Sequence, residues 1–399
     1  MSGFSDKLLL AVKNADSKTA LKIADVASEY GEIVVDAVNK CDCDSIYKIT
    51  HYIAESGVSN KVASELFEAL SKHGDTLIKA VEKCGPKNIE NIVEILSKIN
   101  PNQVDAVIDL LVHHGDDLVK AICKCGDEYT DLIIRCVSHE KFAGDVATHF
   151  LKAMSDHSDS MIKAIKACGV ENYDTIADYS KIFGKYGKMA EGIVDICKVK
   201  KFVGLDEALA LTAKKGDAIC FTSSKINNDI CIVTVNGVYK FNPTISVPQQ
   251  LMSKLDSLKV EYKKLADMGV NMENDPRAVD LGKKFTGFYN ELLSKDYATN
   301  YILDGEIAEE YEKLIRFIDE NRKSGNGKVP TINWTGLADD FSFYENRSVI
   351  NCAEIWGARE MILKGCKFEN LNIPTRYLLD GSQYRPCKNC SNTFITILK

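Results

Sequence analysis

A twelve-residue segment recurs along the first half of the chain and constrains the fold there more than any other feature. Each copy opens on a histidine or tyrosine, continues with a run rich in apolar residues and ends on a cysteine. The copies are Tyr30–Cys41, His73–Cys84, His114–Cys125 and His157–Cys168, with a degenerate one at shorter spacing, Tyr186–Cys197. Their final cysteines are 43, 41, 43 and 29 residues apart. A period near forty with apolar residues at helical spacing predicts stacked units of two or three helices.

The residue types within a copy predict where a helix begins and ends. A Gly-Asp pair such as Gly74 and Asp75 is expected to form a turn in which the Asp side chain caps free backbone N–H groups. The glycine that follows the final cysteine, Gly85 in the second copy, is expected to end the helix. Residues 1–200 are therefore predicted to form an α-solenoid of about four units of ~42 residues. Each repeated histidine lies about 16 Å along a helix from its cysteine, so the two cannot share a metal ion and we interpret both as structural.

A different pattern follows the repeats. Residues 217–222 and 229–235 are typical of β-strands, and Asn236-Gly237 is a strong two-residue turn signal that predicts a hairpin with 238–241 as the return strand. We therefore assign 201–248 to a connector that contains a β-hairpin, and 249–324 to a helical segment. Three helices are expected in that segment, over 249–268, 279–294 and 307–323.

The tail, residues 325–399, alternates between strand-like and helix-like pieces. Asn351 is expected to cap a helix over 352–363, and Pro386 to lie in the first turn of a second helix. Strands are expected over 331–334, 375–379 and 394–398, with a turn at Asp380 and Gly381.

Three cysteines stand at these expected helix starts: Cys352, Cys387 and Cys390. The positive end of a helix dipole lowers the pKa of a thiol and so favours the thiolate that binds metal. Three such ligands leave the fourth position of a tetrahedral zinc open to water, and Glu354 is close enough in sequence to reach that water. No histidine follows His157, which excludes a Ser-His-Asp or Cys-His site built from the tail alone. Cys366 is left without a role.

The order of these residues, Cys-x-Glu and then Pro-Cys-x-x-Cys, matches the signature of zinc deaminases in its all-cysteine variant. Residues 350–360 and 385–390 resemble the deaminase-fold domains at the C-termini of bacterial polymorphic toxins, the YwqJ-like group. The resemblance covers residues 330–399, with a start as early as residue 300. It implies an α/β/α cytidine-deaminase-like fold, zinc on Cys352, Cys387 and Cys390, and Glu354 as proton shuttle. It also implies hydrolytic deamination of cytosine to uracil in DNA or RNA by a toxin that an immunity protein neutralises.

Two other functions are compatible with the same residues. A deaminase of free nucleosides or nucleotides would use identical metal chemistry. A non-enzymatic helical-repeat scaffold with a structural zinc would need a fourth ligand, for which Cys366 is available. A nucleic-acid substrate would need aromatic or polar groups that grip an unpaired base, although packing in the core is at least as good an interpretation of the aromatic residues. The candidate substrate contacts are Trp334, Phe343, Tyr344, Asn351 and Tyr384.

Composition and charge set the remaining expectations. The chain has 399 residues, 45% of them hydrophobic, a formal net charge of −7, and no apolar stretch long enough to span a membrane. Its N-terminus lacks the pattern of a secretory signal, so we expect synthesis in a cytoplasm, with a specialised secretion system as the route into a target cell. Residues 321–399 carry four more basic than acidic side chains, which is compatible with a polyanionic substrate. The helical repeats are expected to bind a protein partner through an extended surface.

Overall fold

The computed structural model describes residues 9–10, 12–13, 15–214, 217–236, 249–272, 274–294, 305–321 and 352–398. The chain divides into two compact units. The first consists of Met1–Ile162 and Tyr179–Gly184, and the second of Lys163–Asp178 and Lys185–Lys399.

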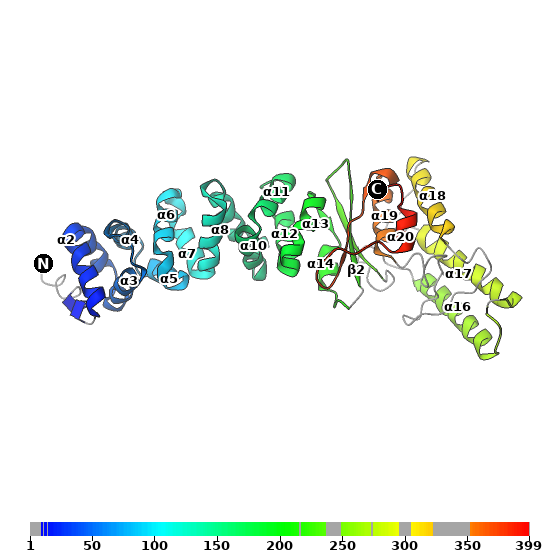
Figure 1. Ribbon diagram of the computed structural model, residues 1–399, viewed down its shortest axis with the longest axis horizontal. Helices are drawn as coiled ribbons and strands as arrows, with labels where there is room; N and C mark the ends of the chain where they lie inside the picture. The colour runs from blue at the N-terminus through cyan, green and yellow to red at the C-terminus, as the bar shows by residue number, and fades with distance from the viewer. Residues whose placement is uncertain are drawn as a thin grey trace. The chain divides into compact units, whose positions relative to one another are not determined.

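The first unit is built from helices, and the prediction of a helical N-terminal region is confirmed. Its α-helices are α2 (Ser17–Lys40), α3 (Cys43–Ser56), α4 (Asn60–His73), α5 (Asp75–Cys84), α6 (Ile89–Lys98), α7 (Val104–His114), α8 (Asp116–Cys125), α9 (Thr130–Ser138) and α10 (Asp145–Asp156). Helix α2 packs on α4, α5 on α7 and α8 on α10. The helices follow one another in chain order (Figure 1), as expected for repeats in which each unit buries its apolar face against the next.

In the repeats, glycine occupies the helix N-cap position that the sequence analysis assigns to aspartate. Gly74 is the N-cap of α5 with a φ of 55°, no side chain bonds to the cap, and Asp75 is already the first helical residue. The prediction of aspartate capping is therefore wrong here. A Cβ on Gly115, at the same place in the next copy, would lie 3.0 Å from the backbone oxygen of Lys83, so the glycine permits a close approach of successive copies. Gly85 ends α5 as predicted, with a φ of 86°.

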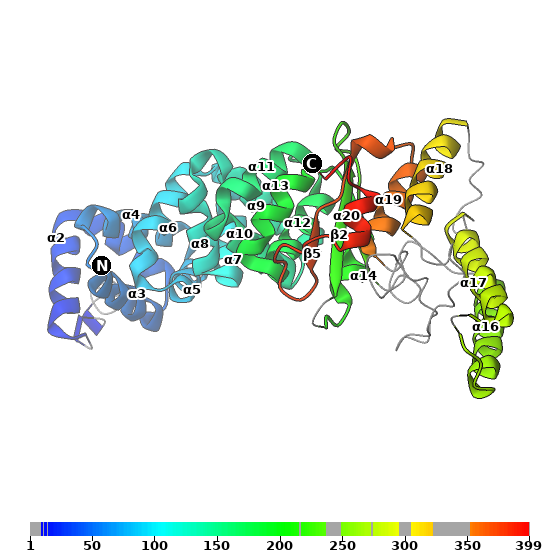
Figure 2. The ribbon, with the colours of Figure 1, turned by 45° about the vertical axis from the view of Figure 1, so that its right-hand side comes forward.

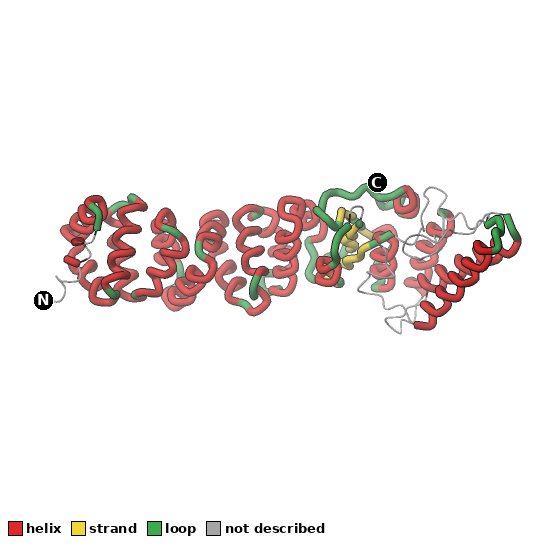
Figure 3. Tube along the Cα trace, turned by 90° about the horizontal axis from the view of Figure 1, so that it is seen from below, coloured by secondary structure: helices red, strands yellow, loops and turns green. Residues whose placement is uncertain are grey.

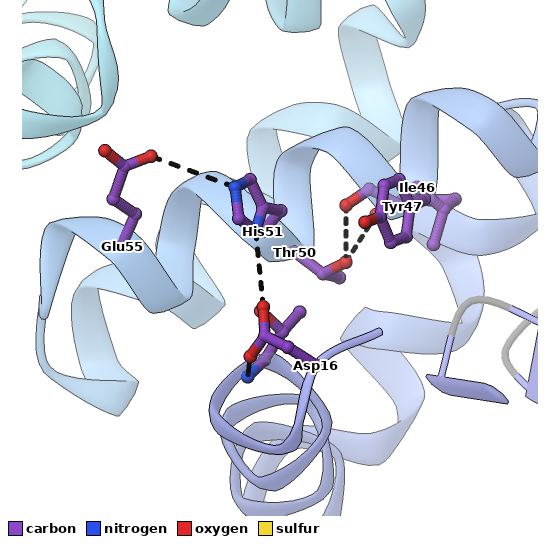
Figure 4. A network of polar contacts seen from close by, with 7 residues as sticks. Asp16, Ile46, Tyr47, Thr50, His51 and Glu55 are labelled. Atoms are coloured by element: carbon purple, nitrogen blue, oxygen red, sulfur yellow. Dashed lines mark hydrogen bonds and ion pairs between the residues drawn. The ribbon is translucent and has the colours of Figure 1, made fainter. Parts of the chain in front are cut away.

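A polar network joins the first two helices (Figure 4). Asp16 caps α2, since its Oδ1 accepts a hydrogen bond from the backbone N–H of Thr19 at 2.8 Å. Its Oδ2 lies 3.7 Å from Nδ1 of His51 on α3, whose Nε2 lies 4.0 Å from Glu55. The hydrogen bond from Thr19 holds the pKa of Asp16 below its ordinary value. The capping aspartate thus also links α2 to α3.

The second unit contains a mixed β-sheet with helices on both faces. Its strands are β1 (Phe202–Val203), β2 (Ala218–Ser224), β3 (Cys231–Val235), β4 (Leu371–Asn372) and β5 (Thr375–Tyr377). The order is β1-β3-β2-β4, and β5 also pairs with β2. Strand β1 is parallel to β3, whereas β2 is antiparallel to β3, β4 and β5. Figure 3 shows the strands gathered in one place.

The sheet joins segments that the sequence assigns to separate regions. The two strands predicted over 217–222 and 229–235 are confirmed as β2 and β3, which pair with each other. The other edge of β2 pairs with β4 and β5 from the tail, with Cys220 opposite Thr375. All seven residues of β2 are buried, so both of its edges and both of its faces need partners. The segment expected to be a connector is therefore part of the same sheet as the tail. The predicted return strand, 238–241, lies outside the described residues.

Three helices enclose this sheet. Helices α13 (Ala190–Cys197) and α14 (Leu205–Ala210) contact β2 and β3, and Cys197 lies against Cys231 with 4.0 Å between the sulfurs. Helix α19 (Ala353–Leu363) contacts β2 and β3 from the side of Thr234, whose hydroxyl donates to the backbone oxygen of Ala353 at 2.7 Å. Figure 2 shows β2 with these helices around it. Helices thus lie against both sides of this small mixed sheet, and one of them, α13, is a helix that the sequence assigns to the repeats.

The remaining helices follow the predicted order. They are α16 (Gln249–Asp267), α17 (Pro276–Ser294), α18 (Gly305–Glu320) and α20 (Lys388–Thr393), and the division between the units crosses α11 (Ser158–Cys168) and α12 (Tyr173–Tyr186). Helix α17 begins three residues earlier than predicted, because Pro276 suits a first helical position and Asp275 accepts a hydrogen bond from the backbone N–H of Arg277. No helix among the described residues is long and apolar enough to cross a membrane.

Two predictions for the tail are wrong in detail. Residues 394–397 form turns and no strand, since the N–H of Phe394 bonds to the oxygen of Cys390 and that of Leu398 to the oxygen of Phe394. The chain thus continues the hydrogen bonding of α20 instead of extending. Pro386 precedes α20, whose N-cap is Cys387. The strand predicted over 331–334 lies outside the described residues, as does Asn351, and Cys352 occupies the N-cap position of α19.

Candidate metal centre

Three cysteine sulfurs converge where α19 and α20 begin. Cys352 is the N-cap of α19, Cys387 is the N-cap of α20, and Cys390 lies in the first turn of α20. The sulfurs of Cys352 and Cys387 are 3.5 Å apart, and all three sulfurs lie within 4.8 Å of one another. All three residues are buried. Segments 35 residues apart in sequence are therefore brought together as the tail motifs predict.

The arrangement fits a bound metal ion. Zinc binds thiolate sulfur at about 2.3 Å in tetrahedral geometry, which places neighbouring sulfurs roughly 3.8 Å apart. The observed separations lie around this value, so a small movement would bring the three sulfurs to one ion. The donor set also suits a cation, because a metal ion can replace the protons of three thiols that are packed together in a buried place. The cluster can hold a metal ion, and its thiolate donors suit Cu(I), zinc and iron–sulfur clusters better than magnesium or calcium.

Burial changes the electrostatics of these thiols from what the sequence predicts. Contact with Cys387 holds the pKa of Cys352 well above its ordinary value, and desolvation does the same for the pKa of Cys390. The expectation that helix starts lower the thiol pKa is therefore wrong for the protein alone. The cause is that each thiol has other thiols and the Glu354 carboxyl as its neighbours, with little water. A bound cation would offset the electrostatic repulsion that arises when the three thiols and the Glu354 carboxyl are ionised together.

Glu354 lies beside the cluster, in the first turn of α19. Its side chain is 3% exposed, and desolvation raises the pKa of its carboxyl. The thiol of Cys390 and the hydroxyl of Thr375 both form hydrogen bonds with this carboxyl, which lower its pKa in part. A buried carboxyl with a raised pKa exchanges protons more easily at neutral pH than an exposed one. Thr375, the first residue of β5, was not predicted as part of the site, because its position depends on the pairing of β5 with β2.

Helix α19 sits close against the sheet at Gly357. A Cβ at this position would lie 2.0 Å from Oγ1 of Thr222 on β2 and 3.2 Å from Oγ1 of Thr234 on β3. The absence of a side chain therefore sets the distance between the helix that carries Cys352 and Glu354 and the strand that carries Cys220. A glycine inside an apolar helix, as Gly357 is in the sequence, is a signal for the close approach of another element.

Replacing Gly357 by alanine is expected to destabilise the protein by about 1–3 kcal/mol or more, because the added methyl group overlaps the fully buried side chain of Thr222. Gly287 is a matched control, since it lies within α17 and its Cβ would meet no atom within 4 Å. Gly287→Ala is expected to stabilise its helix by up to about 1 kcal/mol. Thermal unfolding of the two variants beside the parent protein measures the difference. Equal melting temperatures for the two variants would show that α19 is not held at this distance.

The segment that carries Cys387 and Cys390 contains a buried asparagine. Asn389, between Cys387 and Cys390, is fully buried, and its side-chain amide has no hydrogen-bond partner among the described residues. Burial of an unpaired amide costs about 1–3 kcal/mol. Helix α20 has six residues, and so short a helix is not stable in water by itself. The position of the two ligands on α20 must therefore depend on contacts from other elements.

Cys366 lies apart from the cluster. Its half-buried thiol donates to the backbone oxygen of Lys367 at 3.5 Å, and it lines a separate pocket of about 460 Å³ at the far end of α19, next to Lys364 and Ser224. The group of potential ligands found within the described residues contains Cys352, Cys387 and Cys390 without Cys366. Cys366 is therefore not placed to close a four-cysteine site.

Of the candidate substrate contacts, the structure describes Tyr384. Its ring is half-buried and meets Tyr377 edge-on, with 4.7 Å between the centroids. Its backbone N–H donates to the oxygen of Thr375, the residue whose hydroxyl reaches Glu354. Tyr384 is thus connected to Glu354 through Thr375. The other candidates, Trp334, Phe343, Tyr344 and Asn351, lie outside the described residues.

Comparison with known proteins gives no relative for this chain. No protein-family model matches it, no curated protein matches it, and no solved structure matches it.

Proposed function

We propose that the chain is a zinc-dependent hydrolytic deaminase that converts cytosine to uracil in DNA or RNA and acts as a toxin or effector. The observation that carries the proposal is the convergence of three buried thiols and one buried carboxyl, from two segments whose order matches the zinc-deaminase signature. The net reaction adds water to cytosine and releases ammonia, leaving uracil. Under this proposal Cys352, Cys387 and Cys390 hold the ion, which supplies an activated water when bound.

The role assigned to Glu354 is to move protons. Deamination needs one group that takes a proton from the attacking water and gives a proton to the amino group that leaves. The raised pKa of Glu354 suits a group that must hold and release a proton near neutral pH. Hydrogen bonds with Thr375 and Cys390 would fix the direction in which the carboxyl points. The Glu354 side chain is therefore proposed as the catalytic acid and base, without binding the metal.

Two alternatives lead to different experiments. A deaminase of free nucleosides or nucleotides would use the same residues, so only the substrate distinguishes it from the proposal. A non-enzymatic scaffold with a structural zinc would normally need a fourth protein ligand. The position of Cys366 outside the cluster disfavours this second alternative. Under the main proposal, an immunity protein and the partner of the helical repeats remain to be identified by binding experiments.

The proposal is tested by expressing the chain under tight control in bacteria that cannot excise uracil, and sequencing their DNA and RNA. C-to-T changes in DNA or C-to-U changes in RNA are expected with the parent chain and not with Glu354→Ala. Changes that persist in Glu354→Ala would contradict the assigned mechanism. Their absence from both nucleic acids, together with deamination of free cytidine or its nucleotides by the purified chain, would establish the first alternative in its place.

A further inference from the structure

One side chain outside both motifs holds the segment that carries two of the three ligands. Asn321 follows α18 directly and is 3% exposed. Its Nδ2 donates to the backbone oxygen of Asn389 at 3.3 Å and to Oγ1 of Thr393 at 2.7 Å. It also donates to the oxygen of Phe317 at 3.0 Å, which ties the amide to its own helix. We infer that Asn321 is a positioning residue that fixes Cys387 and Cys390 for metal binding.

The contacts of Asn321 span the whole of α20. Asn389 lies between the two ligands, and Thr393 is the last residue of the helix. A single amide therefore binds both ends of a helix that is too short to be stable alone. Because Asn389 has a buried amide without a partner among the described residues, the segment has no comparable anchor of its own side chain there. The orientation of α20, and with it the position of both sulfurs, depends on Asn321.

Helix α18, which directly precedes Asn321, is itself held in place by contacts with Phe368. Glu310 on α18 accepts a hydrogen bond from the backbone N–H of Phe368 at 2.8 Å. The ring of Phe317 stacks on Phe368, with centroids 5.3 Å apart, and Phe368 stacks on Phe394, with centroids 5.7 Å apart. These contacts hold α18 beside the segment that precedes β4 and beside the end of α20. Through Asn321, α18 therefore fixes the position of α20 and of Cys387 and Cys390.

The inference rests on the metal site of the proposed function and adds a residue that the cysteine motifs do not contain. Groups that orient metal ligands typically contribute 10–100-fold in metal affinity. The probe is Co²⁺, whose bands with thiolate sulfur report both its affinity and the geometry of its ligands. Titration of the metal-free full chain is expected to show about 10–100-fold weaker binding and altered bands in Asn321→Leu. Thr393→Val, which removes an acceptor from the same amide, is expected to weaken binding less.

A matched control separates positioning from general loss of stability. Asn88 in the first unit is also buried, and its Nδ2 donates to the oxygen of Cys84 at 2.6 Å and to Asp116 at 2.9 Å. Asn88→Leu is expected to bind Co²⁺ like the parent chain. The double variant Asn321→Leu/Thr393→Val is expected to bind no more weakly than Asn321→Leu, because the hydrogen bond that Thr393→Val removes is already lost in Asn321→Leu. Parent-like affinity in Asn321→Leu and Thr393→Val, or strictly additive losses, would overturn the inference.

A measurement without metal keeps this inference distinct from the proposed function. Diamide takes two electrons and two protons from a pair of thiols and leaves a disulfide. The sulfurs of Cys352 and Cys387 are 3.5 Å apart, so this pair is expected to oxidise in the metal-free parent chain and more slowly in Asn321→Leu. If the parent chain binds no Co²⁺, the proposed metal site fails. The positioning role is then decided by this rate, and equal rates in both chains would refute it.

Discussion

Replacement of Glu354 by glutamine is expected to lower the rate of cytosine deamination by about 10²–10⁴-fold while the bound metal stays. Glutamine has nearly the shape of glutamate but cannot take up or release the proton. The carboxyl is buried beside Cys390 and Thr375, and desolvation raises its pKa, which are the conditions under which its proton can be exchanged. Uracil formation by the purified chain measures the rate, and elemental analysis of the same sample measures the metal.

The deamination rate and the metal content of Glu354→Gln together show whether Glu354 transfers protons or has a structural role. Metal content equal to that of the parent chain, with deamination nearly absent, agrees with the role of Glu354. Thr375→Val provides a graded comparison, because it removes the hydroxyl that bonds to the carboxyl and leaves the carboxyl itself. Its effect is expected to be smaller. Parent-like activity in Glu354→Gln would contradict the assignment of Glu354 as acid and base.

Replacement of Cys390 by serine is expected to remove most of the bound metal and, with it, the activity. Cys390 is fully buried and its thiol contacts both other cysteines of the cluster, so its replacement removes one of the three sulfur donors. Serine is a poor zinc ligand at neutral pH, since its hydroxyl keeps its proton. The metal content is expected to fall from about one ion per chain toward zero, and thermal stability is expected to fall with it, because a ligand that binds the folded state stabilises it.

Cys366→Ser is the matched control for this prediction. Cys366 is a half-buried thiol in the same unit, and it is not a member of the cluster. Its replacement is expected to leave metal content and activity unchanged. A large loss of metal in Cys366→Ser would revive a four-cysteine structural site. Full retention of metal in Cys390→Ser would contradict the proposed ligand set.

The ligands and Glu354 could be predicted from sequence because each one stands at a local signal. Cys352 and Cys387 cap their helices, and Cys390 and Glu354 lie in the first turns. A helix start is encoded by a few neighbouring residues, so its position can be read without knowledge of the rest of the fold. The prediction of a lowered thiol pKa was wrong for Cys352 and Cys390, because burial and mutual contact depend on the folded structure.

The sheet could be predicted only as isolated strands. Strand β2 reads as a strand in the sequence, but its partner β5 lies more than 150 residues further along, and no local pattern specifies such a pairing. The role of Thr375 follows from this pairing, and that of Gly357 follows from the packing of α19 on β2 and β3, so both were missed. Asn321 was missed for the same reason, since its partners Asn389 and Thr393 are 68 and 72 residues away. The repeats are the opposite case, because their contacts join neighbouring copies.

Uracil formation on defined nucleic acids measures whether Cys352, Cys387 and Cys390 with Glu354 form a site that deaminates cytosine. The purified, zinc-loaded full chain is incubated with single-stranded DNA and RNA that contain cytosine, and uracil is quantified by mass spectrometry beside Glu354→Gln. We expect uracil in at least one nucleic acid with the parent chain and a loss of about 10²–10⁴-fold with the variant. No uracil from a chain that holds its zinc, or equal amounts from both chains, would contradict the proposed function.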